Sequence, residues 1–400
     1  MANYYFQRDT KVFIHVGVGT TTKSMYYELP VLDGYSFSQA TNTSEITLNQ
    51  AQTIGGVSLR ARQMFNDSYA PAEWSFSTYM SPFQSAASAA EGTNGIAGAT
   101  SGDHQEVSEA LWAMFFGQRT GNGLDSDGDN LGIVQTEANA ARVGVFDLYF
   151  VFGGAAMAYT GGKPANFTGA NIGVYKISDC SVNEFSFDFD IDGIATVAWS
   201  GMGKIVSEES ALNGLSGTTT IDGADYTVAT SLITEGVTNT TGFIRNRLSD
   251  LTIAGDASGG SVTYVVTLTG GNITFSNNLT YLTPETLGIV NQPLGHVTGS
   301  RTIGGNLTCY LDNEANASAE LFEDIIEATT DIQNVFSLAF DIGASGTPHL
   351  LLTMATCHLE VPSHSIDDVI SLETNFHALP STIGGTNEVT LFDFVGKDVG

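Results

Sequence analysis

The sequence has few cysteines, which limits how the chain can be held together. Its 400 residues include three, Cys180, Cys309 and Cys357, and none stands in C-x-x-C spacing. Isolated cysteines of this kind are typical of reduced thiols that are buried as small apolar side chains. We therefore expect a fold that depends on its hydrophobic core and not on disulfides.

Basic residues are also scarce, and this shortage restricts the partners. The chain has 43 acidic residues against 14 lysines and arginines, which gives a net charge of −29 at pH 7. A protein this acidic repels nucleic acid phosphates and anionic membranes, so a role in gripping either is excluded. The same charge suits a surface that nucleic acid must pass without sticking.

Long apolar runs are absent as well. No uncharged stretch reaches the length of a membrane-spanning helix, and the opening MANYYFQRDTKVFIHV has no apolar segment of signal-peptide length. We therefore expect synthesis and folding in a cytoplasm, where the N-x-S/T sequons, such as the one at Asn166, have no role.

What the sequence does contain is a long alternation of apolar and polar residues over 185–199, FSFDFDIDGIATVAW. Odd positions are apolar and aromatic, and the even ones include Asp188, Asp190 and Asp192. A period of two predicts a β-strand, here one long strand with a break or bulge near Gly193. One face would be buried, and the other would carry an acidic stripe.

The pattern recurs in the second half of the chain. The shift that places Cys180 on Cys357 places 185–199 on 362–376, where Asp367 and Glu373 fall on the polar parity. A strand hairpin at Asp33-Gly34, a further strand, a helix over 104–116 and long strands have counterparts after residue 242, including a helix over 318–332. We therefore predict two domains, 1–204 and 242–400, joined by a linker or insertion at 205–241. The alternative is that two unrelated β-rich halves look alike.

Three groups of residues are candidate sites, and each has a simpler interpretation. Asp125, Asp127 and Asp129 match the first positions of a calcium loop, but the glycine and glutamate that complete it are missing, so a solvated loop is favoured. Cys357 and nearby histidines suggest a metal site, but strand alternation places His358 and His377 on opposite faces, which favours ordinary packing. The aspartates of 185–199 suit a glycosidase pair or a solvated stripe, and we favour the stripe. No G-x-S-x-G elbow is present.

Residues 60–79, RARQMFNDSYAPAEWSFSTY, together with 29–38, LPVLDGYSFS, resemble tail tube proteins of tailed bacteriophages. The resemblance implies a mainly β fold, with two tandem β-sandwich or half-barrel domains that each carry one flanking α-helix. It also implies that sheets join neighbouring copies into a closed ring, and that rings stack into the tube through which the genome leaves the capsid. A duplicated chain would form a trimeric ring with pseudo-sixfold symmetry, and an unduplicated one a hexamer.

The resemblance further implies a structural protein of the virion tail, assembled in the host bacterial cytoplasm, without catalysis or cofactor. Its partners would be further copies, baseplate and tail-terminator proteins, and a sheath protein if the tail is contractile, while DNA passes through the lumen. In such a ring we expect the following acids to face the lumen: Asp188, Asp190, Asp192, Asp367 and Glu373.

Two alternatives stay open at this point. A carbohydrate-active or adhesive β-sandwich protein of the tail or cell surface would use Asp188 and Asp190 functionally. A secreted surface-layer protein would need a signal peptide, and its absence argues against this interpretation.

Overall fold

The computed structural model describes residues 4–18, 23–46, 53–54, 57–58, 63–84, 104–116, 125–126, 131–132, 143–153, 159–160, 163–164, 172–209, 225–229, 242–255, 262–284, 286–287, 289–327, 336–366, 369–385 and 387–398. Within these ranges the protein is mainly β, as predicted, with two α-helices, α1 (Glu109–Phe115) and α4 (Ser318–Glu327). Pairing links twenty strands into one extended sheet system. No helix in the described residues is long and apolar enough to cross a membrane.

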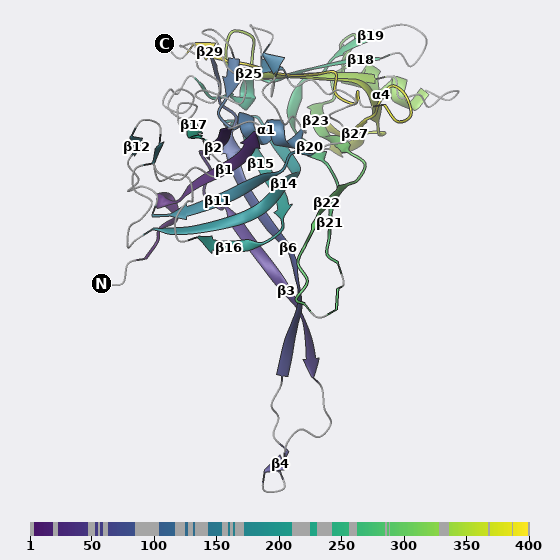
Figure 1. Ribbon diagram of the computed structural model, residues 1–400. Helices are drawn as coiled ribbons and strands as arrows, with labels where there is room; N and C mark the ends of the chain where they lie inside the picture. The colour runs from purple at the N-terminus through teal and green to yellow at the C-terminus, as the bar shows by residue number, and fades with distance from the viewer. Residues whose placement is uncertain are drawn as a thin grey trace.

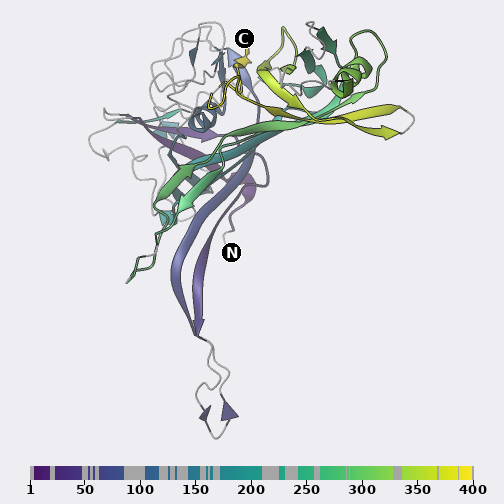
Figure 2. The same cartoon turned by 90° about the vertical axis from the view of Figure 1, so that its right-hand side faces the viewer.

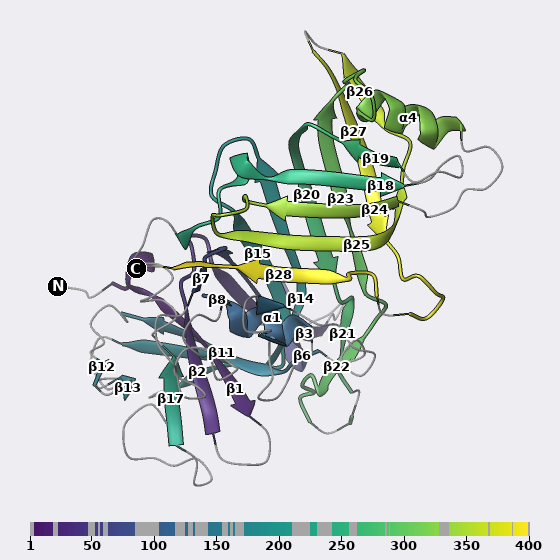
Figure 3. The same ribbon diagram turned by 90° about the horizontal axis from the view of Figure 1, so that it is seen from above.

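One antiparallel sheet, the long sheet, runs through the whole molecule (Figure 3). Its strands pair in the order β3 (Ser36–Ile46), β6 (Gln63–Tyr79), β15 (Thr196–Gly203), β14 (Gly173–Asp190), β20 (Leu268–Ser276), β23 (Thr302–Tyr310), β27 (Ile370–Ala378) and β26 (Ser363–Ile366). The β14–β20 pair connects strands from the N-terminal and C-terminal parts of the chain. The sheet is therefore continuous from one part to the other.

Two further groups of strands pair in the same order as each other. The first is β2 (Lys23–Leu29), β1 (Lys11–Val18), β11 (Phe146–Phe152), the start of β14 and β16 (Val206–Glu209). The second is β19 (Val262–Val265), β18 (Asp250–Gly255), β24 (Phe336–Ile342), β25 (His349–Leu359) and β28 (Leu391–Val395). Cys180 and Cys357 take matching places, each paired with a phenylalanine where the strand register shifts.

The core lies between the long sheet and the other strands, and α1 is at its centre. Every residue of α1 is buried. The Trp112 ring packs 4.7 Å from that of Phe185 on one side and 5.1 Å from that of Phe392 of β28 on the other. The amphipathic helix predicted over 104–116 is thus shorter than expected and covered on all sides, and its first residues instead form β8 (His104–Glu106).

The prediction of a single strand over 185–199 is wrong. β14 ends at Asp190 and β15 begins at Thr196, and the two pair antiparallel with Phe185 opposite Trp199. Gly193, with φ of 153°, lies in the turn between them. Because the pairing joins odd residues to odd ones, the alternation continues unbroken through the hairpin and cannot reveal the turn.

The hairpin predicted at Asp33-Gly34 is also wrong. β2 pairs with β1 and with β17 (Asp225–Ala229), whereas β3 pairs with β6. The turn, with Gly34 at φ of 99°, therefore carries the chain from one group of strands to the other. Since β16 and β17 fall within 205–241, part of the expected linker belongs to the sheet.

A long two-stranded arm, formed by the distal parts of β3 and β6, projects from the body (Figures 1 and 2). A hairpin of β21 (Leu279–Leu282) and β22 (Gly295–Thr298) lies along it, and the Tyr69 N–H donates to the Asn291 carbonyl at 2.9 Å. The remaining short strands are β4 (Thr53–Ile54), β5 (Val57–Ser58), β7 (Pro82–Gln84), β9 (Asp125–Ser126), β10 (Leu131–Gly132), β12 (Tyr159–Thr160), β13 (Lys163–Pro164) and β29 (Lys397–Asp398).

Candidate functional site

The face of the long sheet that points away from α1 is mainly polar, although Ala198 and Tyr310 also lie on it. On β14 the alternation is strict, since Phe185, Phe187 and Phe189 are buried while Asp188 and Asp190 are exposed. The buried face anchors the sheet to the core, and the outer face is free to meet another molecule.

A row of amides crosses this face at the level of Asp188. Strand pairing places Asn272 opposite Asp188, Asn306 opposite Asn272, and Asn375 opposite Asn306. The Asn272 side chain donates a hydrogen bond to the Asp188 carboxylate. At the far end the Asn375 amide donates to Glu360 Oε2 at 2.8 Å. Three asparagine amides therefore lie in a row between the carboxylates of Asp188 and Glu360.

Sequence reasoning missed Asn272 and Asn306, although a signal was present. Each follows two glycines, in GGNITF and GGNLTC. A Cβ built on Gly305 would collide with the backbone oxygen of Asn272, and one on Gly271 would lie 2.6 Å from the ring of Phe189. The repeated glycines are required by this close packing, and they mark where the asparagines face each other.

The other end of the face carries small hydroxyl groups. Ser36, Ser75 and Ser200 stand side by side on β3, β6 and β15, and the first two hydroxyls lie 2.8 Å apart. Short side chains of this kind give a smooth polar surface. They offer no bulky aromatic on which a sugar ring could stack.

The predicted acids are distributed as follows. Asp188 and Asp190 lie on the polar face of β14, and Glu373 is exposed on β27. Asp192 lies in the turn after β14 and not on the strand, where its Oδ1 is 3.4 Å from Arg247 Nη1. Asp367 lies outside the described residues.

Most of the calcium candidates also lie outside the described residues. Asp125 belongs to β9, while Asp127 and Asp129 fall outside the described ranges.

A search against protein-family models finds no match. Among curated proteins, the tail tube protein pb6 of Escherichia phage T5 is 27% identical over 392 residues, which cover 95% of this chain and 74% of that protein. The chain is therefore similar to a phage tail tube protein over almost its whole length. This confirms the resemblance carried by residues 29–38 and 60–79, and the β-rich fold agrees with it.

The histidines near Cys357 lie on neighbouring strands of the sheet. His358 and His377 lie directly opposite each other on β25 and β27, and hence on one face of the sheet. The expectation of opposite faces was wrong because it depended on parity and not on register. His377 Nε2 lies 3.3 Å from Glu360 Oε1, and no group of three metal-ligating side chains occurs in the described part of the chain.

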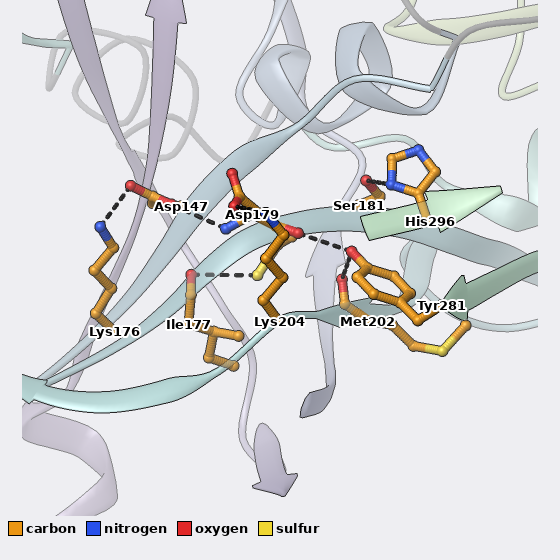
Figure 4. Close-up of polar contacts among 10 residues, drawn as sticks. Asp147, Lys176, Ile177, Asp179, Ser181, Met202, Lys204, Tyr281 and His296 are labelled. Atoms are coloured by element: carbon orange, nitrogen blue, oxygen red, sulfur yellow. Dashed lines mark hydrogen bonds and ion pairs between the residues drawn. The ribbon is translucent and has the colours of Figure 1, made fainter. Parts of the chain in front are cut away.

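A second polar cluster anchors the β21–β22 hairpin to the body of the protein (Figure 4). The Tyr281 hydroxyl donates to the carbonyls of Asp179, at 2.7 Å, and Met202, at 3.1 Å. His296 Nδ1 lies 3.2 Å from the Ser181 hydroxyl, which is fully buried and also donates to the Gly144 carbonyl. This serine and histidine thus tie the hairpin to β14.

The same cluster holds a strongly perturbed acid. Burial would raise the pKa of Asp147, but hydrogen bonds from His15 and Lys176 and the ammonium charge of Lys176 lower it to about 2. Lys176 Nζ lies 2.7 Å from the carboxylate, and the Asp179 N–H donates to it at 3.1 Å. The acid therefore remains charged and fixes β11 to β14.

Proposed function

We propose that the chain assembles with copies of itself into closed rings, which stack into a phage tail tube whose channel is lined by the polar face of the long sheet. One observation carries the proposal: the sheet joins strands from the N-terminal and C-terminal parts of the chain and has a mainly polar outer face, in a chain similar to a tail tube protein. The protein would then be a structural component of the virion tail.

The chemistry of the face supports a channel for DNA. The carboxylates of Asp188, Asp190 and Glu373 are exposed on it, Asp192 would add to them from the turn after β14, and Asp367 stays a predicted lumen residue. Acids repel the phosphate backbone, and the net charge of −29 adds to this repulsion. Serine and asparagine between the acids keep the surface wet, so DNA would slide and not bind.

Ring closure is supported by the strand edges. An unpaired edge promotes uncontrolled association, and closure with neighbouring copies removes it. The matching order of the two groups of strands supports domains at 1–204 and 242–400, joined through 205–241. Three chains would then complete a pseudo-sixfold ring, whereas six would be needed if the halves are not equivalent.

The exposed apolar residues of the arm favour a contact between stacked rings. It projects from the body and, with the hairpin beside it, exposes large apolar side chains, among them Phe65 at 60% and Leu287 at 99%. A cluster of this kind is typical of a surface that another protein covers. We assign it to the adjacent ring, while the tube ends would meet baseplate and tail-terminator proteins, and a sheath would surround a contractile tail.

Electron microscopy of the purified protein in negative stain tests the proposal. Rings or tubes with an open bore are the expected result, and a protein that stays monomeric at high concentration would overturn it. The double variant Asp188→Asn, Asp190→Asn separates this function from a glycan-active one. A tube protein keeps its assembly and gains a lumen that retains DNA more strongly, whereas a glycosidase would lose turnover.

A further inference from the structure

In the described part of the chain, the long sheet ends in two strands that are each paired on one side only, unlike β14 and β20, whose pairing we call the internal joint. β14 pairs with β15 on one side and β20 on the other, and β20 is likewise paired on both sides. At the ends, β3 pairs with β6 alone and β26 with β27 alone, among the described residues. Two edges are therefore open.

The edge strand β26 corresponds to the last part of β14. The shift that places Cys180 on Cys357 places Ser186 on Ser363 and Asp188 on Ser365. The pairings agree, because each segment turns back into a hairpin, with Asp188 opposite Thr196 in one and Ser365 opposite Ser371 in the other. The matched residues are polar in both segments, so the same face of each strand is polar.

The other edge strand, β3, corresponds to β20. Counting along β15 from Thr196 and along β27 from Ser371 places Gly201 on Phe376. In the N-terminal part, a row across the strands runs from Gly201 through Trp74 to Phe37. In the C-terminal part, the equivalent row runs from Phe376 through Gly305 to Ile273. Phe37 of β3 therefore matches Ile273 of β20, so Ser36 matches Asn272 and Ser38 matches Thr274.

We propose that β26 of one copy pairs antiparallel with β3 of the next, with Ser363 opposite Ser38 and Ser365 opposite Ser36. This register copies the internal joint, where Ser186 lies opposite Thr274 and Asp188 opposite Asn272. The inference rests on the proposed ring and specifies how its copies join.

The side chains at the two edges fit this pairing. Ser36 and Ser38 would meet Ser365 and Ser363 on the polar face, and no two like charges would be opposed. On the core face, Ile366 is 79% exposed in the single chain. The pairing places it beside the half-buried ring of Tyr35, so the joint removes exposed apolar surface from water.

The two helices support the same joint. α1 lies over the internal joint, since the ring of Phe115 is 4.6 Å from Phe185 of β14 and 6.4 Å from Phe275 of β20. α4 lies over the open edge, with the ring of Phe322 4.8 Å from that of His364 on β26. α1 is buried on all sides, whereas Ile326 of α4 is exposed. A neighbouring copy would complete the cover over α4.

Disulfide trapping tests the register. Paired residues of an antiparallel sheet have Cα atoms about 4.5–5.5 Å apart, which suits a disulfide. The variant Ser38→Cys, Ser363→Cys should form covalent oligomers of the chain on a non-reducing gel. The internal pair Ser186→Cys, Thr274→Cys is the matched positive control and should link within one chain. The native cysteines are buried and do not interfere.

The outcomes separate this inference from the ring itself. Reduced variants are first inspected for rings by electron microscopy, and their absence there and in the unaltered protein overturns the proposed function. Rings without a Ser38–Ser363 link, while the internal control does link, overturn the register. A link from Ser38→Cys, Ser365→Cys in its place, two residues out of register, also overturns it.

A pair of charge variants gives a second test. Ile366→Asp places a carboxylate on the core face of the joint and should abolish rings, while the chain still folds because this side chain is exposed in the monomer. Ser365→Asp places the same charge on the polar face, where the matching residue is already Asp188, and should leave rings intact. Equal effects of the two variants would contradict the joint.

Discussion

The side-chain amide of Asn272 donates a hydrogen bond to the carboxylate of Asp188, across the joint between β14 and β20. On the other face of the same joint, the rings of Phe185 and Phe275 stack with centroids 4.5 Å apart. Contacts on both faces of the sheet, polar on one and aromatic on the other, thus hold β14 and β20 together. The N-terminal and C-terminal parts of the chain cannot separate without breaking both contacts.

Replacing Asn272 with aspartate should weaken the joint. Asp188 would then face a second carboxylate across the strands, and directly opposed like charges are destabilising by up to about 1 kcal/mol. Chemical denaturation at low and high salt measures the loss, which should shrink as salt screens the repulsion. Asn272→Ser is the control, because it removes the amide without adding charge and should show little salt dependence.

Truncating Phe275 tests the core side of the joint. Phe275→Ala removes a fully buried ring that packs against Phe185 and α1, and a loss of about 3–5 kcal/mol in the free energy of unfolding is expected. Phe275→Leu should cost less because it leaves a smaller cavity. A loss below about 1 kcal/mol for the alanine variant would mean that the joint relaxes around the missing ring.

The sequence predicted the faces of the strands better than their pairing. Alternation places Phe185 in the core and Asp188 outside, since it depends only on the period of two. It cannot locate the turn at Gly193, because the hairpin joins residues of equal parity and the pattern runs through it. Asp192 was therefore expected on a strand but lies in a turn.

The register between strands that are distant in the chain could not be predicted from the sequence either. The row from Asp188 to Asn375 forms from four strands far apart in the chain, and only their pairing brings the amides together. The helix was expected to be amphipathic because Val107, Leu111 and Met114 recur at helical spacing. Its outer side is covered by Phe392 and Phe394, which come from the end of the chain.

Glu106 should make stability fall as pH rises. This fully buried carboxyl accepts hydrogen bonds from Ser108 and Trp112, yet burial raises its pKa from 4.5 to about 7. The folded state therefore binds its proton more tightly than the unfolded one. The stabilisation is complete below pH 4.5 and is lost as pH rises through about 7, by about 1.4 kcal/mol for each unit of pKa difference.

Denaturation at pH 5 and pH 7.5 measures this contribution, with Glu106→Gln as the reference. The glutamine cannot titrate, so the difference in unfolding free energy between the original protein and the variant should decrease toward higher pH. A difference that is constant across this range would show that Glu106 has an ordinary pKa.

The arm should be needed for stacking but not for ring formation. Phe65→Asp charges an exposed apolar position on the arm, and we expect rings without tubes. Ile383→Asp, at a fully exposed apolar residue outside the arm, is the control and should form both rings and tubes. Tube length in electron micrographs is the measurement, and long tubes from the Phe65 variant would count against the arm as the contact between rings.

Reversing charge on the polar face should convert a passive channel into one that holds DNA. In assembled tubes, Asp188→Lys with Asp190→Lys would present new cations to phosphate, and bound DNA should release counterions. Retention of short duplex DNA should therefore rise at low salt and fall steeply as salt increases. The same substitutions at Glu208 and Glu209 of β16, which pairs with the start of β14 far from Asp188 in the strand, should leave retention unchanged.

The mass of the smallest closed ring tests the central claim most directly. Light scattering on rings separated by size should give three times the mass of the chain, because in the proposed ring each chain would supply two equivalent parts of the lining sheet. Six chains in a ring would contradict the equivalence of the two halves, and a monomer at every concentration would contradict the tube itself.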